Sequence, residues 1–149
     1  MTFLANTTRL PDPQLEPAFY DGVLVKRGLA WVVDIVVITI LTTIAGILTL
    51  TVGFFLWPFF FLGIGALYRF ATLAGGSATW GMRLMGVELR GHDGRRFDPM
   101  EAVLHVSGYY ASVFFVLPAI ASVGVMTVSG RRQGLTDLIL GSAAINRPS

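Results

Sequence analysis

Three apolar segments dominate the chain, at residues 28–50, 54–71 and 103–128. The first two are long enough to cross a hydrocarbon core about 30 Å thick as helices. Pro58 lies near the start of the second segment, and proline is well tolerated in the first turn of a helix. The pattern therefore predicts an all-α, polytopic membrane protein whose first two helices form a hairpin with a tight turn.

Basic residues mark one side of this hairpin. Lys26 and Arg27 precede the first helix. Five arginines lie at or after the end of the second helix: Arg69, Arg83, Arg90, Arg95 and Arg96. Because short segments rich in Lys and Arg stay in the cytoplasm, this distribution places the N-terminus and the loop at residues 72–102 on the cytoplasmic side.

The third segment leaves two topologies open, because Pro118 lies near its middle. A single tilted crossing would carry Arg131 and Arg132 to the side opposite the other basic residues. A break at Pro118 that turns the chain back would keep them in the cytoplasm, and broken helices are tolerated where protein or water covers their backbone. We favour the return.

Two shorter regions carry helix and turn signals outside the apolar segments. In the loop, residues 79–90 include apolar positions and residues 91–94 read Gly-His-Asp-Gly, which predicts either a short strand pair or an interfacial helix followed by a hairpin. We favour the interfacial element. Residues 131–145 begin with two arginines and then place apolar residues on one helical face, which predicts a short amphipathic helix at the cytoplasmic surface.

Composition supports the membrane assignment and limits the chemistry. Hydrophobic residues make up 54% of the 149 residues and charged residues 13%, about half the share that is usual in soluble domains. This length predicts one membrane domain at residues 22–145, between a flexible cytoplasmic tail at 1–21 and a short tail at 146–149. The chain has no cysteine, which excludes disulfides and thiolate metal sites, and we expect no cofactor.

A single carboxylate interrupts the first apolar segment. Asp34 is the one charged residue between residues 28 and 68, and a charge in the membrane interior costs about 2.5–3.5 kcal/mol on insertion scales unless a partner compensates it. Arg27 lies seven positions earlier, so a helix places both side chains on one face. Their separation along the axis is about 10 Å, so they interact only if the arginine extends, water bridges them, or another group completes the cluster.

Three separated motifs occur in a fixed order. The first contains Arg27 and Asp34, the second reads Thr-Trp-Gly-Met-Arg-Leu-Met-Gly-Val at residues 79–87, and the third reads Arg-Gln-Gly-Leu-Thr-Asp at residues 132–137. Together they resemble the RDD family of small bacterial integral membrane proteins, which is named for one arginine and two aspartates. These correspond here to Arg27, Asp34 and Asp137. The supporting motif residues are Thr79, Gly81, Arg83, Gln133 and Gly134.

The resemblance implies a multi-pass protein of the bacterial cytoplasmic (inner) membrane, with Asp137 facing the helix bundle. It also implies a transport role, which has been proposed for the family, with cation/proton antiport attributed to some members. Two positions depart from the family pattern: Met82 stands where lysine is usual, and Thr136 where histidine is usual. Roles that depend on those two side chains are not carried over.

Two functions remain open for the cluster of Arg27, Asp34 and Asp137. In the first, two acids that share one basic partner exchange a proton for a cation, which makes the chain a transport protein. In the second, the cluster is a structural clasp that fixes helix packing in an accessory or assembly protein of the membrane. We rank transport first by a narrow margin.

Other functions are disfavoured by what the chain lacks. His92 and His105 have no metal-ligand or nucleophile spacing, so the sequence predicts no enzymatic activity. The arginines are accounted for by orientation and by anionic headgroups at the cytoplasmic face, and no nucleic-acid motif occurs. Because a chain this short cannot easily enclose a permeation route, transport predicts a homo-oligomer or a partner membrane protein.

Overall fold

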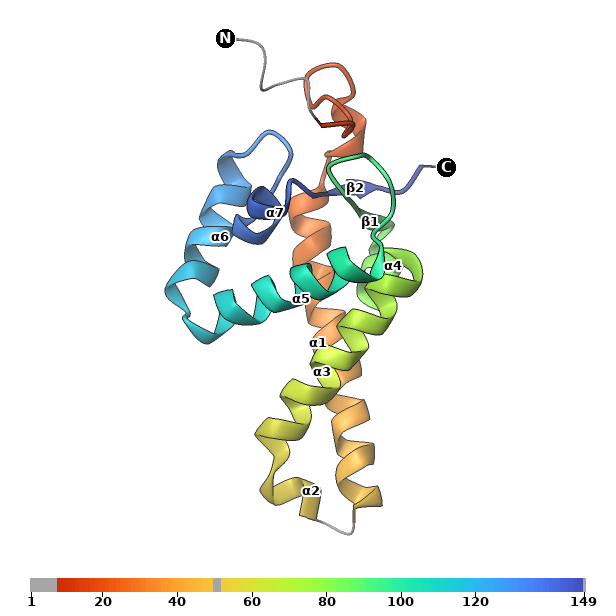
Figure 1. Cartoon of the computed structure of the whole chain (residues 1–149), viewed down its shortest axis with the longest axis vertical. Helices are drawn as coiled ribbons and strands as arrows, with labels where there is room; N and C mark the ends of the chain where they lie inside the picture. Colours follow the sequence, from red (N-terminus) through yellow and green to blue (C-terminus); the bar gives the residue numbers. More distant parts are fainter. Residues whose placement is uncertain (1–7, 50–51, 149) are drawn as a thin grey trace.

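The computed structural model describes residues 8–49 and 52–148 and is mostly helical. The elements are η1 (Pro17–Phe19), α1 (Val23–Leu48), α2 (Val52–Phe55), α3 (Trp57–Gly76), α4 (Trp80–Met85), β1 (Val87–Arg90), α5 (Pro99–Phe114), α6 (Leu117–Val128), α7 (Leu135–Leu140) and β2 (Ala143–Asn146). In Figure 1, α1 and α3 form a long stem, α5 to α7 form a side arm, and the strands and N-terminal segment cover one end. The predicted helical membrane fold is confirmed, and a small sheet is added to it.

The stem contains the helices that can span a membrane. Within the described residues, the segments Pro17–Leu48 and Trp57–Gly76 are long and apolar enough to cross, and the α5–α6 pair would make a third span if its two halves are counted together. α1 begins at Val23, earlier than the predicted residue 28, so Arg27 lies inside the helix. Pro58 occupies the first turn of α3, as predicted.

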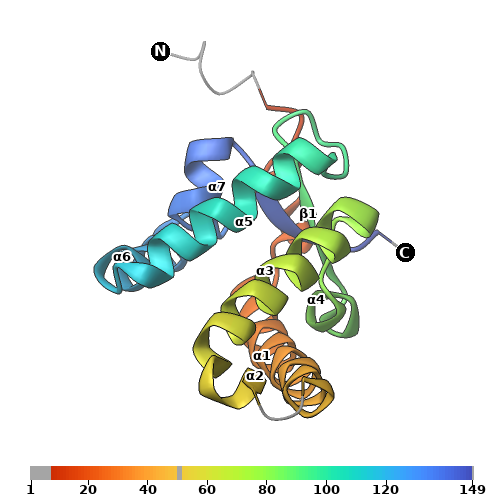
Figure 2. The same cartoon turned by 60° about the horizontal axis from the view of Figure 1, so that its bottom comes forward.

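The side arm is a broken helix. α5 ends at Phe114 and α6 begins at Leu117, with the two axes bent by 114°. Pro118 lies in the first turn of α6, where its missing N–H leaves no hydrogen bond unmade. The predicted break beside Pro118 is therefore confirmed, and Figure 2 shows α7 lying beside α5 after the bend.

The loop at residues 72–102 contains both an interfacial helix and a strand. α4 exposes Trp80 and Leu84, in keeping with the favoured interfacial element. β1 pairs antiparallel with β2, from Val87 opposite Asn146 to Arg90 opposite Ala143, rather than with a neighbour in its own loop. The amphipathic helix predicted for residues 131–145 is correspondingly shorter, because its last residues form β2.

The described part of the N-terminal tail packs against the C-terminal strand; residues 1–7 of the tail expected at residues 1–21 lie outside the described residues. Leu10 and Tyr20 are buried against Ala143 and Ile145 of β2. The Tyr20 hydroxyl also donates a hydrogen bond to the Pro11 carbonyl at 2.8 Å. The tail and the C-terminal strand therefore form one small core above the stem.

Candidate functional site

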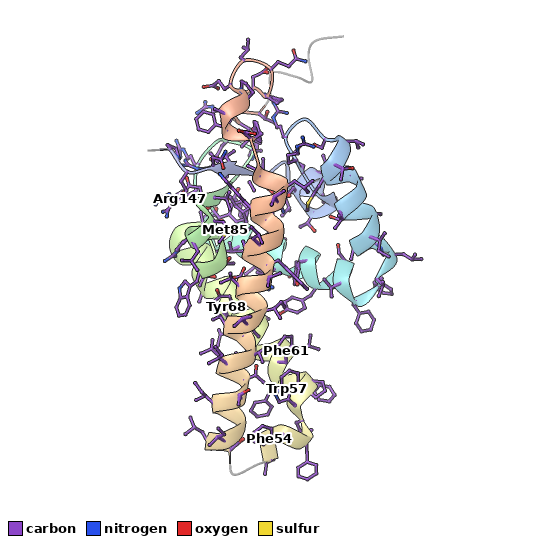
Figure 3. All side chains as sticks on the ribbon, turned by 180° about the vertical axis from the view of Figure 1, so that it is seen from behind. Phe54, Trp57, Phe61, Tyr68, Met85 and Arg147 are labelled. Atoms are coloured by element: carbon purple, nitrogen blue, oxygen red, sulfur yellow. The ribbon has the colours of Figure 1, made fainter. Side chains whose placement is uncertain are left out.

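The two aspartates of the predicted cluster lie in separate centres. Figure 3 shows Tyr68, which belongs to the Asp34 centre, halfway along the stem, well below Met85 and Arg147 near the strands. Asp34 and Asp137 are both almost completely buried, with 2% and 1% of their surfaces exposed. Each carboxylate must therefore find its partners within the protein.

The Asp34 centre joins α1 to α3 and to the start of α4. The Tyr68 hydroxyl donates to Oδ1 of Asp34 at 2.7 Å, and the Thr79 hydroxyl donates to Oδ2 at 2.6 Å. The backbone N–H of Gly81 donates to Oδ1 at 2.9 Å. Three neutral donors from two other helical segments thus surround a carboxylate that the sequence shows in an apolar run.

The close approach of α4 to α1 explains the residues of the second motif, at 79–87. Thr79 is the N-cap of α4, and its hydroxyl also accepts the N–H of Met82 at 3.2 Å. A Cβ at Gly81 would lie 2.8 Å from Oδ1 of Asp34 and would overlap the Ala30 carbonyl oxygen. Glycine is therefore required for the α4 backbone to reach α1.

The cation nearest to Asp34 is Arg69. Its Nη1 lies 3.9 Å from Oδ2 of Asp34, and its guanidinium stacks on the Tyr109 ring, 4.3 Å from the centroid. Nη2 donates to the Tyr109 hydroxyl at 3.4 Å, and Nε1 of Trp31 donates to the same hydroxyl at 2.8 Å. Arg69 is held at an aromatic surface as well as by Asp34.

Sequence reasoning missed Arg69 as a site residue because it was counted as a marker of the cytoplasmic end of a helix. A signal for it exists: Arg69 is the one charged residue in the second apolar segment, as Asp34 is in the first. An isolated cation and an isolated carboxylate in adjacent apolar segments are expected to face each other.

The Asp137 centre joins α7 to the N-terminal part of α1. Nη1 of Arg27 donates to Oδ2 of Asp137 at 2.6 Å and to the Arg132 carbonyl at 3.2 Å. The Gly134 N–H donates to Oδ2 at 3.1 Å, and the Ser142 hydroxyl donates to Oδ1 at 3.2 Å. Arg27 is therefore the direct partner of Asp137, and Asp34 has its own set of hydrogen-bond donors.

Asp137 belongs to α7, which lies outside the membrane-spanning segments. Its charge state follows from the contacts above. Burial alone would raise the pKa of the Asp137 carboxyl, but the positive charge of Arg27 together with its hydrogen bond holds that pKa below the ordinary value. Asp137 is thus a stable anion at neutral pH.

The remaining motif residues support the backbone. Nε2 of Gln133 donates to the Ser142 carbonyl at 2.6 Å, which closes the loop around α7. A Cβ at Gly134 would lie 2.5 Å from the Ser122 hydroxyl oxygen, so glycine lets α7 begin against α6. Arg83 is exposed, and its Nε donates to the Ala78 carbonyl at 3.2 Å. This hydrogen bond ties α4 to the residue before its N-cap.

Both centres border one cavity of about 590 Å³ between α1 and the side arm. Its polar end is formed by Arg27, Asp34, Arg69, His105 and Asp137, and its walls include Trp31, Val113, Val123 and Met126. Nδ1 of His105 lies 3.6 Å from Oδ1 of Asp137. Among residues 8–49 and 52–148, no group of three or more His, Cys, Asp or Glu side chains could hold a metal ion.

Comparison with known proteins gives one match. A family model described as the RDD family matches residues 22–141, which include both centres and all three motifs. No curated protein and no solved structure matches the chain.

Proposed function

The chain belongs to the RDD family, and we propose that it is a membrane transport protein in which Asp34 exchanges a proton for a small cation. The observation that carries this proposal is the set of groups around Asp34. The hydroxyls of Tyr68 and Thr79 donate to the carboxylate, and a hydroxyl can also rotate and accept a hydrogen bond. The centre can therefore accommodate both the ionised and the protonated acid.

Cation binding is compatible with the same atoms. Carboxylate and hydroxyl oxygens are hard ligands, and the hydroxyls of Tyr68 and Thr79 contact the carboxylate of Asp34, which lines the cavity. Arg69 occupies the position of a built-in counter-cation, 3.9 Å from Oδ2 of Asp34. In the proposed exchange, Arg69 withdraws onto Tyr109 when another cation or a proton neutralises Asp34.

The environment of the exchanger is part of the proposal. We place the chain in a bacterial cytoplasmic membrane with its N-terminus in the cytoplasm, where its exposed arginines meet anionic headgroups. We further propose that copies associate, because two membrane-crossing helices provide too few walls for a complete route. No enzymatic activity is proposed.

An accessory role is the second candidate, and one observation favours it. Asp34 and Asp137 each accept three hydrogen bonds from the protein, which is also the pattern of a purely structural clasp. In that case the charge at Asp34 matters for the amount of folded protein, and not for flux.

Proteoliposomes test the two candidates. Purified wild-type protein and Asp34→Asn are reconstituted, and internal pH is followed while sodium, potassium and lithium gradients are imposed in turn. Asp21→Asn makes the same chemical change at an exposed residue and serves as the matched control. Transport predicts cation-dependent proton flux in the wild type and the control, and loss of that flux in folded Asp34→Asn.

Two outcomes contradict the transport proposal. Flux that is absent from folded wild-type protein at every gradient supports the accessory role. Flux that persists in Asp34→Asn removes Asp34 from the exchange, even if the protein does transport ions.

A further inference from the structure

The cavity is larger and more apolar than ion exchange requires. Its volume of about 590 Å³ falls within the range of pockets that hold organic ligands, about 300–1,000 Å³. Beyond the charged end, the walls are formed mainly by Leu24, Trp31, Val113, Ala119, Val123 and Met126. A site with one charged end and long apolar walls fits an amphipathic molecule.

The polar end has buried nitrogen atoms without hydrogen-bond partners. In the part of the chain that the structure describes, Nε of Arg69 and Nδ1 of His105 are buried and have no hydrogen-bond partner. Both residues line the cavity, and the Arg69 side chain is 10% exposed. By contrast, the oxygens of Asp34 and Asp137 already accept three hydrogen bonds each.

This imbalance indicates the charge of the ligand. A buried guanidinium N–H without an acceptor is unfavourable, and an oxygen anion would satisfy it with a charge-assisted hydrogen bond. The unsatisfied Arg69 N–H therefore selects a head group that accepts hydrogen bonds.

We propose that the cavity binds a single-chain amphiphile with an anionic oxygen head group, of the long-chain carboxylate class. The head group lies at Arg69, and the chain lies between α1 and the α5–α6 arm. This site goes beyond ion exchange at Asp34 and does not depend on it, because occupancy of the cavity requires no flux.

The tip of the side arm is apolar and exposed. At the bend between α5 and α6, the side chains of Phe114, Phe115 and Leu117 are 80%, 65% and 78% exposed. An apolar tip of this kind is stable within lipid and unfavourable in water. The arm that forms one wall of the cavity is thus suited to lie among acyl chains.

Trp31 offers a direct reporter, since it lines the cavity. Trp57→Phe with Trp80→Phe leaves Trp31 as the one tryptophan, whereas Trp31→Phe with Trp80→Phe leaves Trp57 near the far end of the stem (Figure 3). Each delipidated protein is titrated in detergent with dibrominated stearate, whose bromines quench nearby tryptophan. The neutral dibrominated alcohol of equal chain length and a brominated two-chain anionic phospholipid are the matched probes.

The expected result is saturable quenching of Trp31 at one stearate per chain, with binding about tenfold or more tighter than that of the alcohol. Trp57 should show no saturable component. Arg69→Met should reduce stearate binding to the level of the alcohol, and Arg69→Lys should retain part of the preference. Ala119→Phe, which fills the apolar wall, should weaken both single-chain probes.

Three results overturn the proposal. Equal binding of stearate and alcohol by the wild type excludes an anionic head group at Arg69, and this comparison holds even if Arg69→Met does not fold. Saturable quenching of Trp57 equal to that of Trp31 excludes the cavity as the site. Equal or tighter binding of the phospholipid excludes a single-chain ligand. None of these measurements depends on ion flux, so the transport proposal stands or falls separately.

Discussion

The two aspartate centres place the same side chain in different surroundings. Asp137 has a guanidinium at 2.6 Å, and Asp34 has one at 3.9 Å with neutral hydroxyl and amide donors nearer. Arg27 is fixed between Asp137 and a backbone carbonyl, whereas Arg69 also has an aromatic ring to rest on. The distance to the counter-cation thus distinguishes the two residues: Asp137 is in a close ion pair, whereas Asp34 is bound mainly by neutral donors.

The centres also connect different parts of the chain. Arg27 and Asp137 are 110 residues apart, so their ion pair holds the C-terminal α7 to the first helix. Asp34 instead holds the start of α4 and the middle of α3 against α1. We infer that one centre closes the fold, and that the other lies where the cavity meets the stem.

Asp137→Ala should have the largest effect on stability. It leaves Arg27 largely buried without its carboxylate, and breaking a buried pair in this way costs about 3–5 kcal/mol. Asp34→Ala should cost less, because Arg69 keeps its contacts with Tyr109. Unfolding of both purified variants in detergent, with the wild type alongside, measures the difference.

A double substitution sharpens this prediction. Arg27→Met with Asp137→Leu removes both charges and should recover much of the stability lost in Asp137→Ala, because a well-packed apolar pair can replace a buried ion pair. No recovery would mean that the hydrogen bonds from Gly134 and Ser142, rather than the pair itself, hold α7 in place.

Acid should remove the Asp137 contribution, with an effect no larger than that of Asp137→Ala. Because the folded-state pKa of this carboxyl lies below its ordinary value of 3.8, its contribution is complete above the unfolded pKa. It is then lost as the pH falls through the folded pKa. The free energy of unfolding, measured from pH 7 down to pH 3, should therefore decrease more steeply at the acid end in the wild type than in Asp137→Asn. Parallel curves would contradict this assignment.

Much of the stem could be predicted from the sequence because its signals are local. The apolar lengths predict α1 and α3, and Pro118 predicts the break between α5 and α6. Asp34 stands out as a charge in an apolar run. Each of these inferences needs only the residues of one segment.

The partners could not be predicted, because they depend on contacts between distant segments. Arg27 and Asp34 share a helical face, but about 10 Å of rise separates them, and packing of α7 decides that Arg27 binds Asp137. β1 lies more than 50 residues before β2, so local turn signals favoured a hairpin that does not form. The separation into two centres is a property of the tertiary fold.

Gly81→Ala tests the close approach at the Asp34 centre and should have an intermediate effect. The added Cβ would overlap the Ala30 carbonyl oxygen, so α4 must shift, at a cost of about 1–3 kcal/mol. Gly75→Ala is the matched control, because it lies within α3 and its Cβ would meet nothing within 4 Å. It should be neutral or slightly stabilising. Equal stabilities of the two variants would show that α4 has room to move away from α1.

Removing one hydroxyl from each centre should give the smallest effects on stability and the clearest difference in function. Tyr68→Phe and Ser142→Ala each delete one hydrogen bond to a carboxylate, at a cost of about 0.5–1.5 kcal/mol for a typical intramolecular hydrogen bond. If Asp34 exchanges the proton, Tyr68→Phe should shift the pH dependence of flux, because its hydroxyl no longer stabilises the ionised acid. Ser142→Ala should leave that dependence unchanged, since Arg27 still pairs with Asp137. Matching pH profiles for both variants, measured in the same proteoliposomes, would mean that the distance to the guanidinium does not separate the roles of the two aspartates.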